Sequence, residues 1–151
     1  MIPLPSKPKI TSEDGNLAII EIEGLYPGYG QTIGNGLRRV LLSSLPGAAI
    51  TTAKIEGVGH EFSTIEGVKE DVVDILLNLK QVRFRLHGDG PFSMHLSLKG
   101  ERAAHAEDFR VSSQVEIVNP KQRIATLTSK KSELEIEATV ERGLGYVPVE
   151  A

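Results

Sequence analysis

The sequence predicts an α+β fold with mostly antiparallel sheets and two principal helices. Three observations support this prediction: short segments in which apolar residues alternate, turn signals between those segments, and two stretches with helical periodicity. The length of 151 residues and the apolar fraction of 40% suit one or two small units, each with its own core.

The first half of the chain predicts an arm, two strands and a helix. Residues 1–10 are rich in proline and are expected to form a loose arm. The isoleucine-rich segment Leu17–Glu23 predicts a strand, and the β-branched residues in Ala48–Val58 predict another. Between them, Tyr26–Gly47 holds five glycines and an Arg-Arg pair, and its part Ile33–Leu45 predicts a helix.

The apolar residues of the predicted helix Ile33–Leu45 spread widely around its axis. At about 100° per residue they cover an arc of about 200°, roughly twice what one core face needs. We therefore expect this helix to be covered on two sides. Arg38 falls inside the apolar arc and Arg39 on the polar side. An arginine within a leucine surface is typical of a protein interface, but a surface arginine whose stem covers a core helix fits the pattern equally well.

Residues 67–81 predict a second helix, which is amphipathic. Its apolar side chains recur at i, i+4, i+7, i+8 and i+11 and form one stripe: Val68, Val72, Ile75, Leu76 and Leu79. Upstream, Ser63 and Glu66 have the spacing of a capping box. Three carboxylates near the start of the helix are expected to favour its dipole: Glu70, Asp71 and Asp74.

Alternating segments in the second half predict further strands. Val82–Gly88 and Phe92–Leu98 are separated by the turn sequence HGDGP and predict a hairpin. The segments QVEIV and RIATLT flank another turn signal, Asn119-Pro120. In ELEIEATVE, four glutamates are expected outside, and the side chains expected inside are those of Leu134, Ile136, Ala138 and Val140.

The Gly-rich turn 28–36, between a strand and a helix, is an arrangement with which many phosphate sites begin. A dinucleotide fingerprint would need glycine at Ile33, and a P-loop would need Gly-Lys-Ser/Thr where this chain has Gly-Leu-Arg-Arg. Neither motif matches. Gly34 and Gly36 would each cost about 1 kcal/mol of helix propensity, so we expect either a phosphate or another backbone to approach them closely.

Long segments of this chain carry a resemblance to a known family. Two segments resemble the amino-terminal domain of the bacterial RNA polymerase α subunit: GYGQTIGNGLRRVLLSSLPGAAIT and KIEGVGHEFSTIEGVKEDVVDILLNLK. Two later segments resemble the same family and follow in the same order along the chain: VEIVNPKQRIATLT and VERGLGYVP. The resemblance runs from about Leu17 to Pro148 and is least in Gly90–Ser113. It implies two subdomains: a dimerising assembly subdomain that starts with 1–45 and resumes at 147–151, and an inserted β-rich subdomain, 46–146.

The resemblance also implies a function and a set of contacts. The family member is a non-catalytic assembly subunit of DNA-directed RNA polymerase, the nucleotidyltransferase of transcription, and it scaffolds the large β and β′ subunits. Its β contacts fall on Arg38, Arg39, Leu42, His60, Glu61 and Phe62. Its β′ contact falls on Lys80. Its homodimer interface falls on Ile33, Leu37, Leu41 and Leu45.

The family's dimerising subdomain is built from both ends of a longer chain. Because this sequence ends at Ala151, we expect a C-terminally truncated form without the second half of that subdomain and without the DNA-binding domain. This leaves homodimerisation by this chain open, and DNA is expected to be met only through the assembly. Several leucines of Ile33–Leu45 are then expected to face water.

The remaining residues predict no catalytic, metal or cofactor site. The chain has no cysteine, its four histidines lack ligand spacing, and Ser43-Ser44 has no histidine at plausible spacing. The net charge of −3 does not favour a free-standing nucleic-acid binder. Without a signal peptide or a membrane span, a cytoplasmic location is expected, in bacterial cytosol, nucleoid or a plastid. The alternative to an assembly subunit is a small phosphate- or nucleotide-binding α+β domain that uses the turn 28–36.

Overall fold

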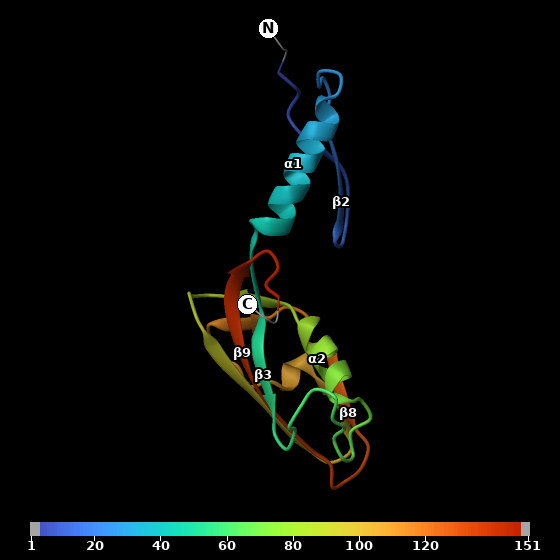
Figure 1. The fold of residues 1–151 in the computed structure, drawn as a ribbon, viewed down its shortest axis with the longest axis vertical. Coiled ribbons are helices and arrows are strands. Elements are labelled where there is room, and N and C mark those ends of the chain that lie inside the picture. Colours follow the sequence, from blue (N-terminus) through green and yellow to red (C-terminus); the bar gives the residue numbers. More distant parts are fainter. Residues whose placement is uncertain (1–3, 149–151) are drawn as a thin grey trace. The chain divides into compact units, whose positions relative to one another are not determined.

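The computed structural model describes residues 4–148 and confirms the mixed α+β architecture (Figure 1). Within this range it contains two α-helices, and all its strand pairs are antiparallel. The chain forms two compact units. The first unit holds Met1–Leu45 with Gly145–Ala151, and the second holds Pro46–Leu144.

The first unit contains a hairpin and a helix. Strands β1 (Lys9–Asp14) and β2 (Leu17–Glu21) form the hairpin around Gly15, whose φ of 55° is a left-handed conformation that glycine adopts readily. Every residue of the two strands is exposed. An isolated two-stranded hairpin has only marginal stability in water, and the exposure of every residue here shows that few side chains pack against this one.

The expected loose arm at residues 1–10 is wrong at its last two residues. Lys9 and Ile10 belong to β1 and pair with Glu21 and Ile20. The prolines suggested an unpaired arm, but they precede the strand and therefore remove no N–H group from its ladder. Residues 1–3 and 149–151, including most of the segment expected to resume the assembly subdomain, lie outside the described residues.

Helix α1 (Tyr29–Ser43) begins before the predicted start at Ile33. The residue that precedes it, Gly28, has φ 88° and ψ −18°, a left-handed conformation that allows the sharp entry into the helix. The Gly-rich stretch is thus mainly helical, because Gly30, Gly34 and Gly36 all lie inside α1.

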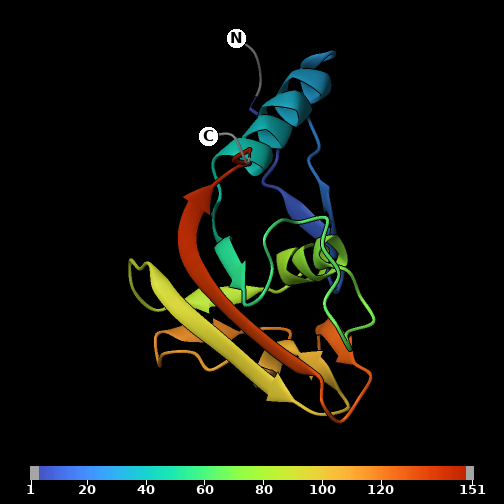
Figure 2. The ribbon, with the colours of Figure 1, turned by 60° about the horizontal axis from the view of Figure 1, so that its bottom comes forward.

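The core of the second unit lies on a three-stranded sheet with the order β3-β9-β5. These strands are β3 (Pro46–Ile55), β9 (Glu133–Leu144) and β5 (Phe92–Lys99). Figure 2 shows β9 as a long curved strand that runs beside β5. The inward side chains predicted for β9 are confirmed, since all four are buried: Leu134, Ile136, Ala138 and Val140.

The other elements of the second unit close this core. Helix α2 (Val72–Lys80) contributes Ile75, fully buried, and Leu79 to the core cluster. Strand pairs β4–β7 and β6–β8 and a 3-10 helix complete the unit: β4 (Phe84–Leu86), β7 (Val115–Ile117), β6 (Arg102–His105), β8 (Arg123–Leu127) and η1 (Ala106–Asp108).

The predicted hairpin between Val82–Gly88 and Phe92–Leu98 is wrong. Strand β4 pairs with β7, whereas β5 pairs with β9. The turn sequence between them therefore carries the chain from one sheet to another. Turn residues determine where the backbone changes direction, but burial of each strand's apolar face decides which strand becomes its partner.

The predicted cap of the second helix is also wrong. Helix α2 starts at Val72, and its N-cap is Asp71, whose Oδ1 accepts a hydrogen bond from the Asp74 N–H at 2.7 Å. Val68 instead forms an isolated β-bridge with Leu127. The hydroxyl of Ser63 donates to the His60 carbonyl at 2.7 Å, so it stabilises the upstream loop.

Candidate partner-binding surfaces

The first candidate surface is the apolar side of α1. No residue of this helix is buried within the described chain, and Ile33 is half-buried. The large apolar side chains of α1 that are more than half exposed are Leu37, at 51%, Val40, Leu41 and Leu42, at 69%, and Leu45, just after the helix, is also more than half exposed. Because fully burying each would contribute roughly 1.5–3 kcal/mol, a contiguous surface of this kind marks a protein interaction site.

The arginine pair lies beside a shallow depression on α1. Arg38, Arg39 and Leu42 line it, together with the smaller or polar residues Thr32, Asn35 and Gly36. At its C-terminal end, the Ser43 hydroxyl donates to the Arg39 carbonyl at 2.7 Å. The structure therefore brings three of the predicted site residues, Arg38, Arg39 and Leu42, to one place.

The glycines of α1 leave room for a close approach. A Cβ atom built at Gly34 or Gly36 would meet no neighbouring atom within 4 Å in the described chain, the helix's own backbone aside. The expected backbone or phosphate neighbour is therefore not supplied by residues 4–148. Because the two glycines are two positions apart, they lie on nearly opposite sides of the helix, and each leaves a separate place that a partner's backbone could reach.

The second candidate surface is the loop before α2. Phe62, at 80% exposure, projects from it between His60 and Ser63. The Ser63 N–H donates to the His60 carbonyl at 3.2 Å, and the Val72 N–H donates to the Ser63 carbonyl at 3.2 Å. These bonds tie the loop to the first turn of α2, so the exposed phenyl ring is carried on an ordered frame. Its predicted neighbours His60 and Glu61 are also exposed.

Glu70 anchors this loop to strand β8. Its carboxylate accepts hydrogen bonds from the Thr126 N–H at 2.6 Å and the Thr126 hydroxyl at 2.9 Å, and it lies 3.2 Å from Arg123 Nη2. Burial by itself raises the pKa of Glu70, but the two Thr126 hydrogen bonds and the Arg123 charge outweigh it and leave the pKa lowered. Glu70 thus anchors the loop to β8. Its predicted interaction with the helix dipole is the weaker contribution, because Glu70 precedes the N-cap residue Asp71.

We expect Glu70→Gln to lower the free energy of unfolding by about 1–2 kcal/mol at pH 7, since it removes charge-assisted hydrogen bonds. A carboxyl group whose pKa is lower in the folded than in the unfolded protein stabilises the fold at pH values above its unfolded-state pKa of about 4.3. This stabilisation is lost as the pH falls through the folded-state pKa. The difference between wild type and variant should therefore shrink below about pH 4. Urea titrations from pH 3 to 7 measure it, with exposed Glu66→Gln as control. A difference independent of pH would contradict the anchor.

The third candidate surface surrounds Lys80, the last residue of α2. Its side chain is exposed at the helix end, where a cation complements the negative end of the dipole. Arg83 Nη1 donates to the Lys80 carbonyl at 3.2 Å. The helix end is therefore held by the same segment that leads into β4.

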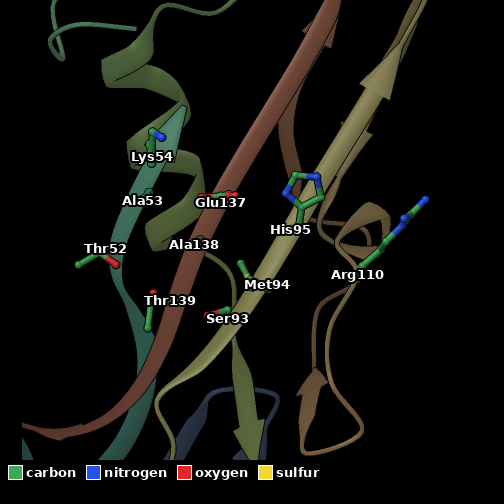
Figure 3. Close-up of a pocket in the computed structure, with 10 residues that line it drawn as sticks. All are labelled: Thr52, Ala53, Lys54, Ser93, Met94, His95, Arg110, Glu137, Ala138 and Thr139. Carbon is green, nitrogen blue, oxygen red and sulfur yellow. The ribbon is translucent and has the colours of Figure 1, made fainter. Parts of the chain in front are cut away.

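A shallow hollow on the outer face of the three-stranded sheet is lined by polar side chains (Figure 3). Lys54, Glu137 and His95 are cross-strand partners and lie in a row over β3, β9 and β5. His95 Nε2 lies 3.3 Å from Glu135, and Arg110 extends away from the strands in Figure 3. Residues 4–148 contain no cluster of three side chains suited to hold a metal. The face has the paired, mixed charges of a solvated sheet surface.

Comparison with known proteins gives a consistent assignment. Residues 53–151 match the RNA polymerase Rpb3/RpoA insert domain family. The chain is 50% identical over 149 residues to the DNA-directed RNA polymerase subunit alpha of Roseiflexus sp. strain RS-1. The aligned residues make up 99% of this chain and 46% of that protein. It is 51% identical over 146 residues, 97% of this chain and 46% of the relative, to the subunit from Rubrobacter xylanophilus.

A third relative, the subunit alpha from Aquifex aeolicus, is 52% identical over 130 residues, which are 85% of this chain and 41% of that protein. The chain thus spans about half the length of the curated relatives it matches. These matches do not support the phosphate-binding alternative, and neither does the helical conformation of Gly30, Gly34 and Gly36. Among the described helices, none has the length and apolar character needed to cross a bilayer.

Proposed function

The chain belongs to the RNA polymerase Rpb3/RpoA insert domain family, and we propose that it is a non-catalytic assembly subunit of DNA-directed RNA polymerase that scaffolds the large β and β′ subunits. The observation that supports this most is the exposed leucine and arginine surface of α1. The function is structural: this chain supplies surfaces, and transcription chemistry belongs to the large subunits. The assembly acts in the cytoplasm and meets DNA as a whole.

We assign the β contact to Arg38, Arg39 and Leu42 on α1 and to His60, Glu61 and Phe62 on the loop before α2. Arginine is among the residue types that contribute most to binding energy at protein interfaces, and its planar guanidinium suits bidentate recognition of carboxylates. The apolar side chains of Ile33, Leu37 and Leu41 on the same helix, with Leu45 just after its end, are assigned to a second copy of the α subunit, because self-association would bury the most apolar part of this segment.

We expect Arg39→Ala to weaken binding to the β subunit by about 2 kcal/mol, roughly thirtyfold, while leaving the fold intact. The guanidinium lies at the depression on α1, where its removal leaves partner groups unpaired. Biolayer interferometry with immobilised β subunit measures the affinity, and circular dichroism checks the fold. Gln31→Ala, an exposed change on the same helix, is the control. Unchanged β affinity for Arg39→Ala would show that this flank is not the contact.

We assign the β′ contact to Lys80 and expect Lys80→Glu to reduce recruitment of β′ to the assembled complex by about tenfold. The side chain is exposed, so its loss should change the melting temperature by little. Co-purification of tagged β′ measures recruitment. Ile75→Ala, a core change in the same helix, is the reference for structural damage. Equal losses of melting temperature in the two variants would make Lys80 a structural residue.

A further inference from the structure

We infer that Lys80 is one part of a larger cationic surface, formed with Arg83 and Lys121, that docks an acidic segment of the β′ subunit. This inference rests on the proposed function, since it takes Lys80 as a β′ contact. It adds Arg83, three positions after Lys80, and Lys121, which is distant in the sequence, and it states the chemistry of the partner.

The three cations are mounted on one hydrogen-bonded frame. The Arg83 guanidinium donates to the Lys80 carbonyl at 3.2 Å. Asn119 joins this segment to the turn that carries Lys121: its Oδ1 accepts from the Arg83 N–H at 2.7 Å, and its Nδ2 donates to the Gln81 carbonyl at 3.0 Å. The Val118 N–H donates to the Arg83 carbonyl at 2.8 Å. The turn at 118–122 therefore lies against the end of α2.

A second contact closes the frame. Gln122 Nε2 donates to Gln81 Oε1 at 3.3 Å, and the Gln122 N–H donates to the Asn119 carbonyl at 3.0 Å. Lys121 is thus held between two residues that both reach the 80–83 segment. All three cationic side chains are exposed. A partner would meet positive charges whose backbone positions are already fixed, which lowers the entropy cost of docking.

The neighbouring charges cancel and leave these three unbalanced. Arg85 is paired with Glu116 at 3.1 Å, and Arg123 is paired with Glu70 at 3.2 Å. In the part of the chain that the structure describes, none of the ion pairs involves Lys80, Arg83 or Lys121. Glu107 touches the turn through its N–H, which donates to the Pro120 carbonyl, but its carboxylate pairs with none of the three.

An acidic protein segment fits this surface better than a nucleic acid. The whole chain carries a net charge of −3, so a polyanion would be repelled beyond the three cations. The cations are interspersed with the amide side chains of Gln81, Asn119 and Gln122 and with Val118, which is half exposed. Mixed apolar and amide contacts with a few unpaired cations are the composition of a protein interface rim.

The test is a set of single charge reversals measured in the α–β–β′ assembly. Arg83→Glu and Lys121→Glu should each weaken β′ binding about tenfold at low salt, and the loss should shrink at high salt as the charges are screened. Arg83→Lys keeps the charge and should restore most of the binding. The matched control is Lys131→Glu, an exposed lysine in another turn. Circular dichroism and the melting temperature check that each variant folds.

The outcomes separate the two proposals. If Lys80→Glu impairs β′ binding while Arg83→Glu and Lys121→Glu match the Lys131→Glu control, the extended surface is wrong and the assembly function stands. If the wild-type chain binds neither large subunit, the assembly function itself is wrong. If the reversals leave β′ binding unchanged but abolish retention of a labelled DNA or RNA duplex, the partner is a nucleic acid and the inference is overturned.

Discussion

Replacing Ile136 with alanine is expected to lower the free energy of unfolding of the second unit by about 2–5 kcal/mol, the range for removing a large aliphatic side chain from a packed core. Ile136 is fully buried on the central strand β9. It is the cross-strand partner of Ile55 on β3 and of Leu96 on β5, so its removal opens a cavity that touches all three strands. Urea denaturation followed by far-ultraviolet circular dichroism measures the loss.

The control is Leu77→Ala on α2. It removes a side chain of the same size, but Leu77 is half exposed and lies on the outer side of the helix. Its expected effect is within about 0.5 kcal/mol. Because the chain has two units, hydrogen exchange of the β9 amides should accompany the titration to show which unit unfolds. Similar losses for Ile136→Ala and Leu77→Ala would show that the sheet is not the main source of stability.

Gly67→Ala is expected to destabilise the second unit by roughly 3 kcal/mol, from backbone strain and the loss of a buried hydrogen bond together. Gly67 has φ +76°, and a Cβ atom there would overlap the Ser132 hydroxyl. Ser132 is buried, and its hydroxyl donates to the Gly67 carbonyl at 2.8 Å. The same carbonyl accepts the Thr128 N–H at 2.8 Å.

A matched glycine separates the two causes. Gly57 has φ +77°, and a Cβ atom there would meet no atom within 4 Å. Gly57→Ala should therefore show the backbone strain alone, about 1–2 kcal/mol. The excess at Gly67 measures the clash with Ser132, and the same urea titration reads both. If the two variants lost equal stability, the contact between the loop and the 128–132 turn would contribute nothing.

Local pattern predicted the fold class and the buried faces, because both depend on periodicities of two and 3.6 residues. The four inward residues of β9 are an example, as are the buried Ile75 and Leu79 of α2. Strand pairing was not predictable in the same way. The segments β4 and β5 are adjacent in sequence and each has a clear alternation, but their partners lie in β7 and β9, far along the chain.

Capping shows a second limit. Ser63 and Glu66 had the right spacing for a cap, but Asp71 forms the N-cap because the chain turns at Gly67 and bridges β8 before the helix begins. A capping motif records a local preference, and a long-range contact decides which of several preferences is used.

The candidate surfaces also include one part that follows from local helix geometry and one part that depends on long-range contacts. Arg39 and Leu42 are three positions apart, which places them about 60° from each other on a regular helix, and both line the same depression. The frame around Lys80 was not predictable, since it depends on the side-chain amides of Asn119 and Gln122, which contact residues 36 and 41 positions earlier. Amide side chains carry no periodic signal that would reveal such a contact.

The pairing of Pro46 with Leu144 has a consequence for how this architecture can evolve. The second unit starts and finishes on paired backbone positions, about 5 Å apart across the two strands. To the rest of the chain it is equivalent to one long hairpin loop, whatever its length, and the entropy of closing a loop grows only slowly with length. The second unit can therefore gain, lose or replace strands while its two ends stay paired, and the rest of the chain needs no rearrangement.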